Sequence, residues 1–126
     1  MVEVDEDGVW RNLETGEEYI SMAQVPPGAM WYADWMLGLE HDPFRGPDGH
    51  CLVVKLPNGN DWMIDGPCSN CTDREDYLRG GHKCWVRHGS LPNITVDKQG
   101  QTCAAGAGSI ASGDYHGFLR NGEFTS

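Results

Sequence analysis

Cysteine and histidine side chains gather in one stretch of the chain, and their types suit a zinc site. Cys68 and Cys71 form a Cys-x-x-Cys turn, and His82 and Cys84 follow two residues apart. On a strand, a two-residue spacing puts both side chains on one face. Thiolates and imidazoles from separate segments are the usual ligands of a tetrahedral zinc ion. The sequence therefore predicts a structural zinc site, with His88 and Cys103 further along the chain.

Two other states of these cysteines also fit the sequence. Buried thiols behave as small apolar residues and need no metal. A disulfide, such as one between Cys71 and Cys84, would form if the protein lay on the outside of a particle. The chain has five cysteines, so any scheme that pairs the others leaves one over. From the residues alone, metal binding, buried thiols and a disulfide all stay open.

Cys103 and His116 suggest a second kind of chemistry, that of a nucleophile and its base. Cys103 precedes the small-residue run 104–109, whose backbone N–H groups would suit an oxyanion. This run lacks the Gly-Lys-Ser/Thr ending of a phosphate-binding loop. The plainer interpretation is that Cys103 binds metal or fills the core, and that His116 is a hydrogen-bonded structural residue.

The five tryptophans predict a core rich in aromatic side chains, because each buries a large area. An exposed pair formed by Trp31 and Trp35 would instead mark a protein interface. Four aspartates stand at the ends of predicted strands, where we interpret them as turn caps. They are Asp61, Asp65, Asp97 and Asp114.

Short hairpins must position these groups, because apolar residues alternate over short runs between turns rich in glycine, proline and asparagine. The predicted strands are 9–12, 17–20, 30–33, 51–56, 61–65, 83–87, 94–97, 115–119 and 123–124, with a short helical turn after Asp34. The expected fold class is mainly β: a single compact domain of short antiparallel hairpins with little helix, tied by a metal site. Residues 1–27 form an acidic N-terminal hairpin segment of this domain, and residues 28–126 form its β-rich Cys/His core.

The charge of the chain limits its partners. Nine basic and 19 acidic residues give a net charge of −10, which argues against free nucleic acid because phosphates need a basic face. Residues 1–20 carry seven acids against Arg11 alone. This acidic start is either a solvated surface or a segment that docks on a basic partner. The sequence shows neither a long apolar span nor a signal peptide.

Several runs of the sequence resemble a family of small uncharacterised proteins of tailed bacteriophages. The resemblance covers roughly residues 28–124, and more distantly it extends to a bacterial Cys/His-containing domain of unknown function. It implies a compact, β-rich, metal-binding unit encoded by a phage, and it implies no known activity. The matching runs are 62–65, 69–72, 82–89, 95–98, 102–110 and 115–122.

Cys51 and Cys68 depart from the pattern of this family, which weakens them as ligands. The predicted zinc ligands are therefore Cys71, His82, Cys84 and Cys103. We expect a non-enzymatic, phage-encoded zinc-binding protein that acts as a virion accessory or decoration protein, or as a module that binds a host protein. It would reside in the host cytoplasm or the virion, without nucleic acid or membrane. The alternative is a small hydrolase that uses Cys103 with His116, or a zinc-bound water beside His88.

Overall fold

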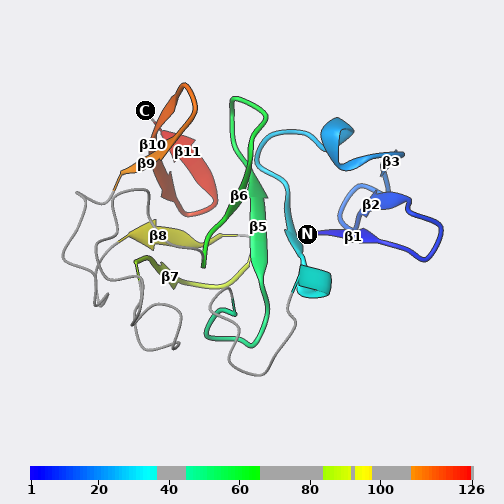
Figure 1. Ribbon diagram of the computed structural model, residues 1–126, viewed down its shortest axis with the longest axis horizontal. Coiled ribbons are helices and arrows are strands. Elements are labelled where there is room, and N and C mark those ends of the chain that lie inside the picture. Colours follow the sequence, from blue (N-terminus) through cyan, green and yellow to red (C-terminus); the bar gives the residue numbers. More distant parts are fainter. Residues whose placement is uncertain (37–44, 66–83, 92, 98–108, 126) are drawn as a thin grey trace.

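The computed structural model describes residues 1–36, 45–65, 84–91, 93–97 and 109–125. Over these ranges the chain forms eleven strands in three antiparallel sheets, together with two single-turn 3-10 helices and no α-helix (Figure 1). This confirms the prediction of a mainly β fold built from short hairpins. No helix within these ranges has the length and apolar character needed to cross a membrane.

The N-terminal sheet has the order β1-β2-β3, with strands Val2–Val4, Trp10–Asn12 and Glu18–Tyr19. The hairpin of β2 and β3 was predicted, whereas β1 was not. In the register of β1 and β2, Val4 lies opposite Trp10. Val2 and Trp10 are buried, Val4 is half-buried, and Glu3 is exposed. The single-turn helix η1 (Met22–Gln24) follows this sheet.

The central sheet has the order β4-β5-β6, with strands Met30–Tyr32, Leu52–Lys55 and Asp61–Met63. The helical turn η2 (Asp34–Met36) follows β4, as predicted after Asp34. Every residue of β5 is buried, so this strand is covered on both faces. Leu52 and Val54 belong to one apolar cluster, and Cys51 and Val53 belong to another. The alternation of side chains along β5 thus supplies two cores.

The C-terminal sheet has the order β11-β10-β8-β7, and β9 pairs with β10 beside this path. Its strands are Val86–His88 (β7), Thr95–Asp97 (β8), Ile110–Ser112 (β9), Tyr115–Arg120 (β10) and Glu123–Thr125 (β11). The β10–β11 hairpin was predicted, and its turn holds Asn121 and Gly122 at positive φ, as a tight hairpin requires. Strand β9 was not among the predicted strands.

The central sheet lies between the other two (Figure 1). The larger core is shared with the C-terminal sheet and includes Ile94, Val96, Ile110 and Leu119. The smaller core is shared with the N-terminal sheet and includes Val2 and Trp10. Each outer sheet therefore buries one face against the same central strand, β5.

Candidate functional site

Cys84 is the one predicted zinc ligand that lies within the described residues, and it is 1% exposed. Cys71, His82 and Cys103 lie outside them. Cys84 precedes strand β7, which begins at Val86, so the prediction of a strand that carries Cys84 is wrong at this residue. In the described part of the chain, no group of three or more His, Cys, Asp and Glu side chains could hold a metal ion. Zinc binding by the full set of four residues stays a prediction.

The two histidines of the hydrolase hypothesis both have polar partners. His88 Nε2 lies 2.7 Å from Oδ1 of Asp97, across the pair formed by β7 and β8. His116 Nε2 lies 2.8 Å from Oγ of Ser109. His116 is therefore hydrogen-bonded, as the structural interpretation of this residue expected. Its approach to Cys103 is outside the described residues, so that pairing stays untested.

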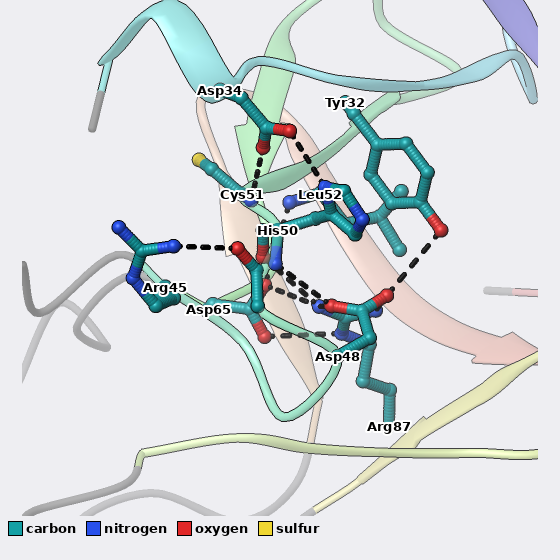
Figure 2. A network of polar contacts seen from close by, with 10 residues as sticks. Tyr32, Asp34, Arg45, Asp48, His50, Cys51, Leu52, Asp65 and Arg87 are labelled. Carbon is teal, nitrogen blue, oxygen red and sulfur yellow. Dashed lines mark hydrogen bonds and ion pairs between the residues drawn. The ribbon is translucent and has the colours of Figure 1, made fainter. Parts of the chain in front are cut away.

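The most densely connected polar group is centred on Arg87 of β7 (Figure 2). The guanidinium donates two hydrogen bonds to Asp48, from Nη1 at 2.9 Å and from Nη2 at 2.8 Å. It donates two more to Asp65, from Nε at 3.1 Å and from Nη2 at 2.9 Å. The carbonyl oxygen of His50 lies 3.3 Å from Nη2. Such fork-to-carboxylate pairing fixes both position and orientation.

Burial sets the electrostatics of this group. The side chains of Arg87 and Asp65 are 7% and 8% exposed, whereas that of Asp48 is 35% exposed. Burial raises the pKa of Asp65 above its ordinary value, and the hydrogen bonds from Arg87 only partly offset this. Burial also acts on Asp48, but there the hydrogen bonds from Arg87 and from the N–H of His50 outweigh it and lower the pKa. Against the effect of burial, the two carboxylates raise the pKa of Arg87.

Gly46 lets the 45–50 loop come close enough to complete this arrangement. A Cβ at this position would overlap Nη2 of Arg87 and would lie 2.6 Å from Oδ2 of Asp65. Both approaches are closer than a side chain can tolerate. Any larger residue at Gly46 would therefore force the Arg87 guanidinium, the Asp65 carboxylate or the loop itself to shift.

A second set of contacts extends the network toward β4 and η2 (Figure 2). Tyr32 donates a hydrogen bond of 3.3 Å to Asp48, and its ring stacks on the His50 ring with centroids 4.1 Å apart. His50 Nδ1 lies 2.6 Å from Oδ2 of Asp34, whose other oxygen accepts the backbone N–H of Cys51. Burial raises the pKa of Asp34, but these two hydrogen bonds outweigh it and lower the pKa overall. The His50 imidazole is thus held by the Asp34 carboxylate at Nδ1 and by the Tyr32 ring, which stacks on its face.

This arrangement acts as a cross-link. Arg87 comes from β7, Asp65 follows β6, and Asp48 comes from the loop before β5, so one guanidinium joins the central and C-terminal sheets. A shallow hollow lies beside it, lined in part by Tyr32, Asp48 and Leu91. Both oxygens of Asp48 already accept hydrogen bonds. The network is therefore better suited to stiffen the surface around this hollow than to bind a charged ligand itself.

Sequence reasoning missed this network, because it interpreted Asp65 as a turn cap. Each of the four strand-end aspartates binds another side chain, which the turn-cap interpretation did not predict. Asp65 binds Arg87, Asp61 binds Lys55, Asp97 binds His88 and Asp114 binds Asn58. The signal in the sequence was the two cations on strands, Lys55 and Arg87, placed where apolar neighbours predict burial.

The tryptophans divide into core and surface. Trp31 is 1% and Trp10 is 7% exposed, which confirms them as core residues, whereas Trp35 is 58% exposed. The predicted exposed pair of Trp31 and Trp35 is thus wrong for Trp31. The Trp10 ring packs edge-on against Trp31, with centroids 5.4 Å apart, and edge-on against Trp35 at 6.0 Å. Trp35 is therefore a surface ring supported from beneath by a buried one.

No family model, no curated protein and no solved structure matches this chain.

Proposed function

We propose that this protein is a non-enzymatic, phage-encoded binding protein whose fold is tied by a zinc ion. It acts as an accessory or decoration protein of the virion, or as a module that engages a host protein. The sequence resemblance supports the phage origin, and the Cys/His-rich stretch supports zinc. The observation that carries a binding role is the exposed Trp35.

Trp35 has the properties of an interface anchor. Tryptophan is enriched among the residues that dominate binding energy, because a large ring can be desolvated at little cost in conformational entropy. The Trp35 ring is 58% exposed, and its edge-to-face contact with Trp10 holds it in place. A partner therefore meets an aromatic surface that is already ordered before binding.

The binding role is tested with particles of the encoding phage that lack this protein. Purified protein is added, and the bound fraction is measured by sedimentation. We expect Trp35→Ala to weaken binding at least about tenfold, in the range of hot-spot residues. Ile20→Ala is the matched control, because Ile20 is also exposed and apolar but is not aromatic. If neither particles nor proteins of the host bind the wild-type chain, the proposal fails.

Zinc is tested by native mass spectrometry of protein made without a histidine tag. We expect one zinc ion per chain, and we expect a chelator to lower the melting temperature, because metal bound to the folded state adds to its stability. Substitution of Cys84 by Ser should remove the metal. Protein that contains no zinc and that a chelator does not affect would contradict this part of the proposal.

The hydrolase hypothesis remains the second candidate, and one contact favours it. The hydrogen bond between His88 and Asp97 orients an imidazole by a carboxylate, as in many sites that activate water. This hypothesis predicts that Cys103→Ser or His88→Gln abolishes turnover of an activated ester and spares the fold. Loss of the fold on Cys103→Ser would instead make that cysteine structural.

A further inference from the structure

A second hollow lies at the opposite end of the C-terminal sheet from the Arg87 network. It is lined by residues from the turn of the β5–β6 hairpin, the start of β10 and the end of β11. Its lining comes from three parts of the chain that are far apart in sequence. The lining includes Asn58, Asp114, Tyr115, His116, Phe124 and Thr125.

Asn58 fixes the polar side of this hollow. Its amide Nδ2 donates to the carbonyl oxygen of Ser112 at 2.8 Å and to Oδ1 of Asp114 at 2.9 Å. Its Oδ1 accepts the N–H of Asn60 at 3.0 Å. Asn58 is thus fully engaged, and it holds one oxygen of Asp114 in place. Within the described residues, the other oxygen of this exposed carboxylate has no hydrogen-bond partner.

His116 adds a second polar group to the same hollow. Its Nε2 is engaged by Ser109, whereas Nδ1 has no hydrogen-bond partner among the residues that the structure describes. Asp114 and His116 are two residues apart, and both are exposed. Asp114 lies in the turn between β9 and β10 and His116 lies in β10, and both line the same hollow.

Two aromatic residues form the apolar part of the lining. The Tyr115 and Phe124 rings meet edge to face, with centroids 5.8 Å apart. The Tyr115 hydroxyl donates to the carbonyl oxygen of Thr125 at 3.0 Å. Gly117 makes this possible, because a Cβ there would overlap both of these oxygens. The end of β11 is therefore held against β10, and the half-buried Phe124 ring borders the hollow.

We propose that this hollow binds a neutral saccharide. A fixed carboxylate oxygen and an imidazole nitrogen offer acceptors to sugar hydroxyl groups, and an aromatic ring offers a surface to the C–H face of a pyranose. The carboxylate disfavours an anionic ligand. The described residues here give too few ligands for a metal ion. This site is separate from Trp35, so the proposed protein-binding function does not depend on it.

The test uses the full chain and NMR titration with methyl β-glucopyranoside, methyl β-galactopyranoside and N-acetylglucosamine, each up to about 10 mM, a range suited to weak binding. We expect at least one sugar to shift the backbone amide signals of residues 114–116 and 124–125. Asp114→Asn should weaken that binding about tenfold, as expected when a hydrogen bond to a charged group is lost. Phe124→Leu should weaken it as well.

Asp7→Asn is the matched control, because it removes an exposed carboxylate from the turn between β1 and β2. The central sheet separates these two strands from β10 and β11 (Figure 1). His116→Gln serves as a further variant if Asp114→Asn alters the fold, which the amide spectrum itself reports. Three results would overturn the proposal. The first is no shift with any of the three sugars. The second is binding by both Asp114→Asn and Phe124→Leu that is as strong as that of the wild-type protein. The third is binding of the anionic N-acetylneuraminate that is as strong as that of the neutral sugars.

Discussion

Two buried cations hold this molecule together, and they do so in different ways. Arg87 joins the central and C-terminal sheets through two aspartates, one of them as buried as itself. Lys55 of β5 is 3% exposed and pairs at 2.6 Å with Asp61, which is 33% exposed. Its ammonium also donates to the Met22 carbonyl at 2.9 Å and lies 5.9 Å from the centre of the Trp31 ring. Lys55 thus ties the η1 segment to the central sheet.

The comparison indicates that the burial of the partner carboxylate determines how much a buried cation contributes to the free energy of unfolding. Removal of Arg87 would take two charge-assisted hydrogen bonds from the buried carboxylate of Asp65, which is costly. Removal of Lys55 would leave Asp61 near water, where solvent can replace the lost partner. The planar guanidinium also makes two paired contacts, whereas the ammonium is a single point of charge. We therefore expect the Arg87 joint to contribute more to stability than the Lys55 joint.

The largest expected effect is that of Arg87→Met, which should lower the free energy of unfolding by about 3–5 kcal/mol. The reason is that both Asp48 and Asp65 lose two hydrogen bonds from the guanidinium, and Asp65 stays buried. Urea denaturation measures this loss. Arg11→Met is the control, because Arg11 pairs with Glu18 at the surface and should matter little. A loss below about 1 kcal/mol for Arg87→Met would remove the basis of the comparison.

Arg87→Lys sharpens the first prediction. This variant keeps the positive charge but loses the fork that meets two carboxylates at once. We expect its unfolding free energy to fall between those of the wild-type protein and Arg87→Met. Full recovery of wild-type stability would show that charge alone matters at this position, and that the geometry of the guanidinium does not.

Lys55→Met should lower the free energy of unfolding by about 1–3 kcal/mol, less than Arg87→Met does. The Met22 carbonyl loses the hydrogen bond from Lys55, whereas water can replace Lys55 as the partner of the Asp61 carboxylate. The same urea experiment gives the value. Because η1 is released, the signals of residues near Met22 should also change in an amide spectrum. A loss larger than that of Arg87→Met would reverse the order proposed here.

The pH dependence of stability tests the aspartates of the network. The folded-state pKa values of Asp34 and Asp48 are lowered, so the unfolded chain binds their protons first as the pH falls. Their stabilisation is complete above the ordinary carboxyl value near 3.8 and is lost as the pH drops below it. Asp65 has a raised folded-state pKa, so the folded chain binds its proton first as the pH falls. Protonation of Asp65 therefore increases the free energy of unfolding as the pH falls toward the ordinary carboxyl value.

We therefore expect Asp48→Asn to flatten the loss of stability in acid, and Asp65→Asn to steepen it. The effect of Asp48→Asn should be about 1 kcal/mol, because a carboxylate that is about one-third exposed is partly screened by solvent. Urea midpoints measured from neutral pH down into the acid range give both slopes. Identical slopes for the two variants would contradict the opposite assignments.

The smallest expected effect is that of His88→Gln. His88 and Asp97 are 41% and 37% exposed, and exposed ion pairs contribute about 0–1 kcal/mol. We expect a change in unfolding free energy within this range in the urea experiment. A larger loss would show that this pair contributes to stability on the same scale as the contacts of Arg87 and Lys55.

Local pattern predicted much of the fold. The β5–β6 hairpin was predicted because apolar residues run continuously on both sides of a Pro-Asn-Gly turn, and the β10–β11 hairpin because an Asn-Gly pair favours its turn. Strand β1 was missed, since only Val2 and Val4 mark it among acidic neighbours. Strand β9 was missed because Ile110 is the single large residue in a run of small ones. Its strand conformation comes from pairing with β10.

The candidate site was much harder to predict. Arg87 lies 22 residues from Asp65 and 39 residues from Asp48, and no short motif links such positions. The cysteines and histidines drew attention because they stand close in sequence, yet Cys84 is the one ligand candidate that the described residues contain. The contacts of Arg87 depend on how the central and C-terminal sheets meet, which is a property of the tertiary fold.

The tryptophan pairs give the protein two internal optical probes. Trp10 and Trp31 meet at 80° in the smaller core, and Trp62 and Trp85 meet at 89° beside the larger one. Indole rings this close couple their electronic transitions, so each pair should contribute its own signal to circular dichroism. Variants that lack one pair would then report separately on each half of the molecule during melting. Such a record would reveal whether the two halves come apart in a single step or one after the other.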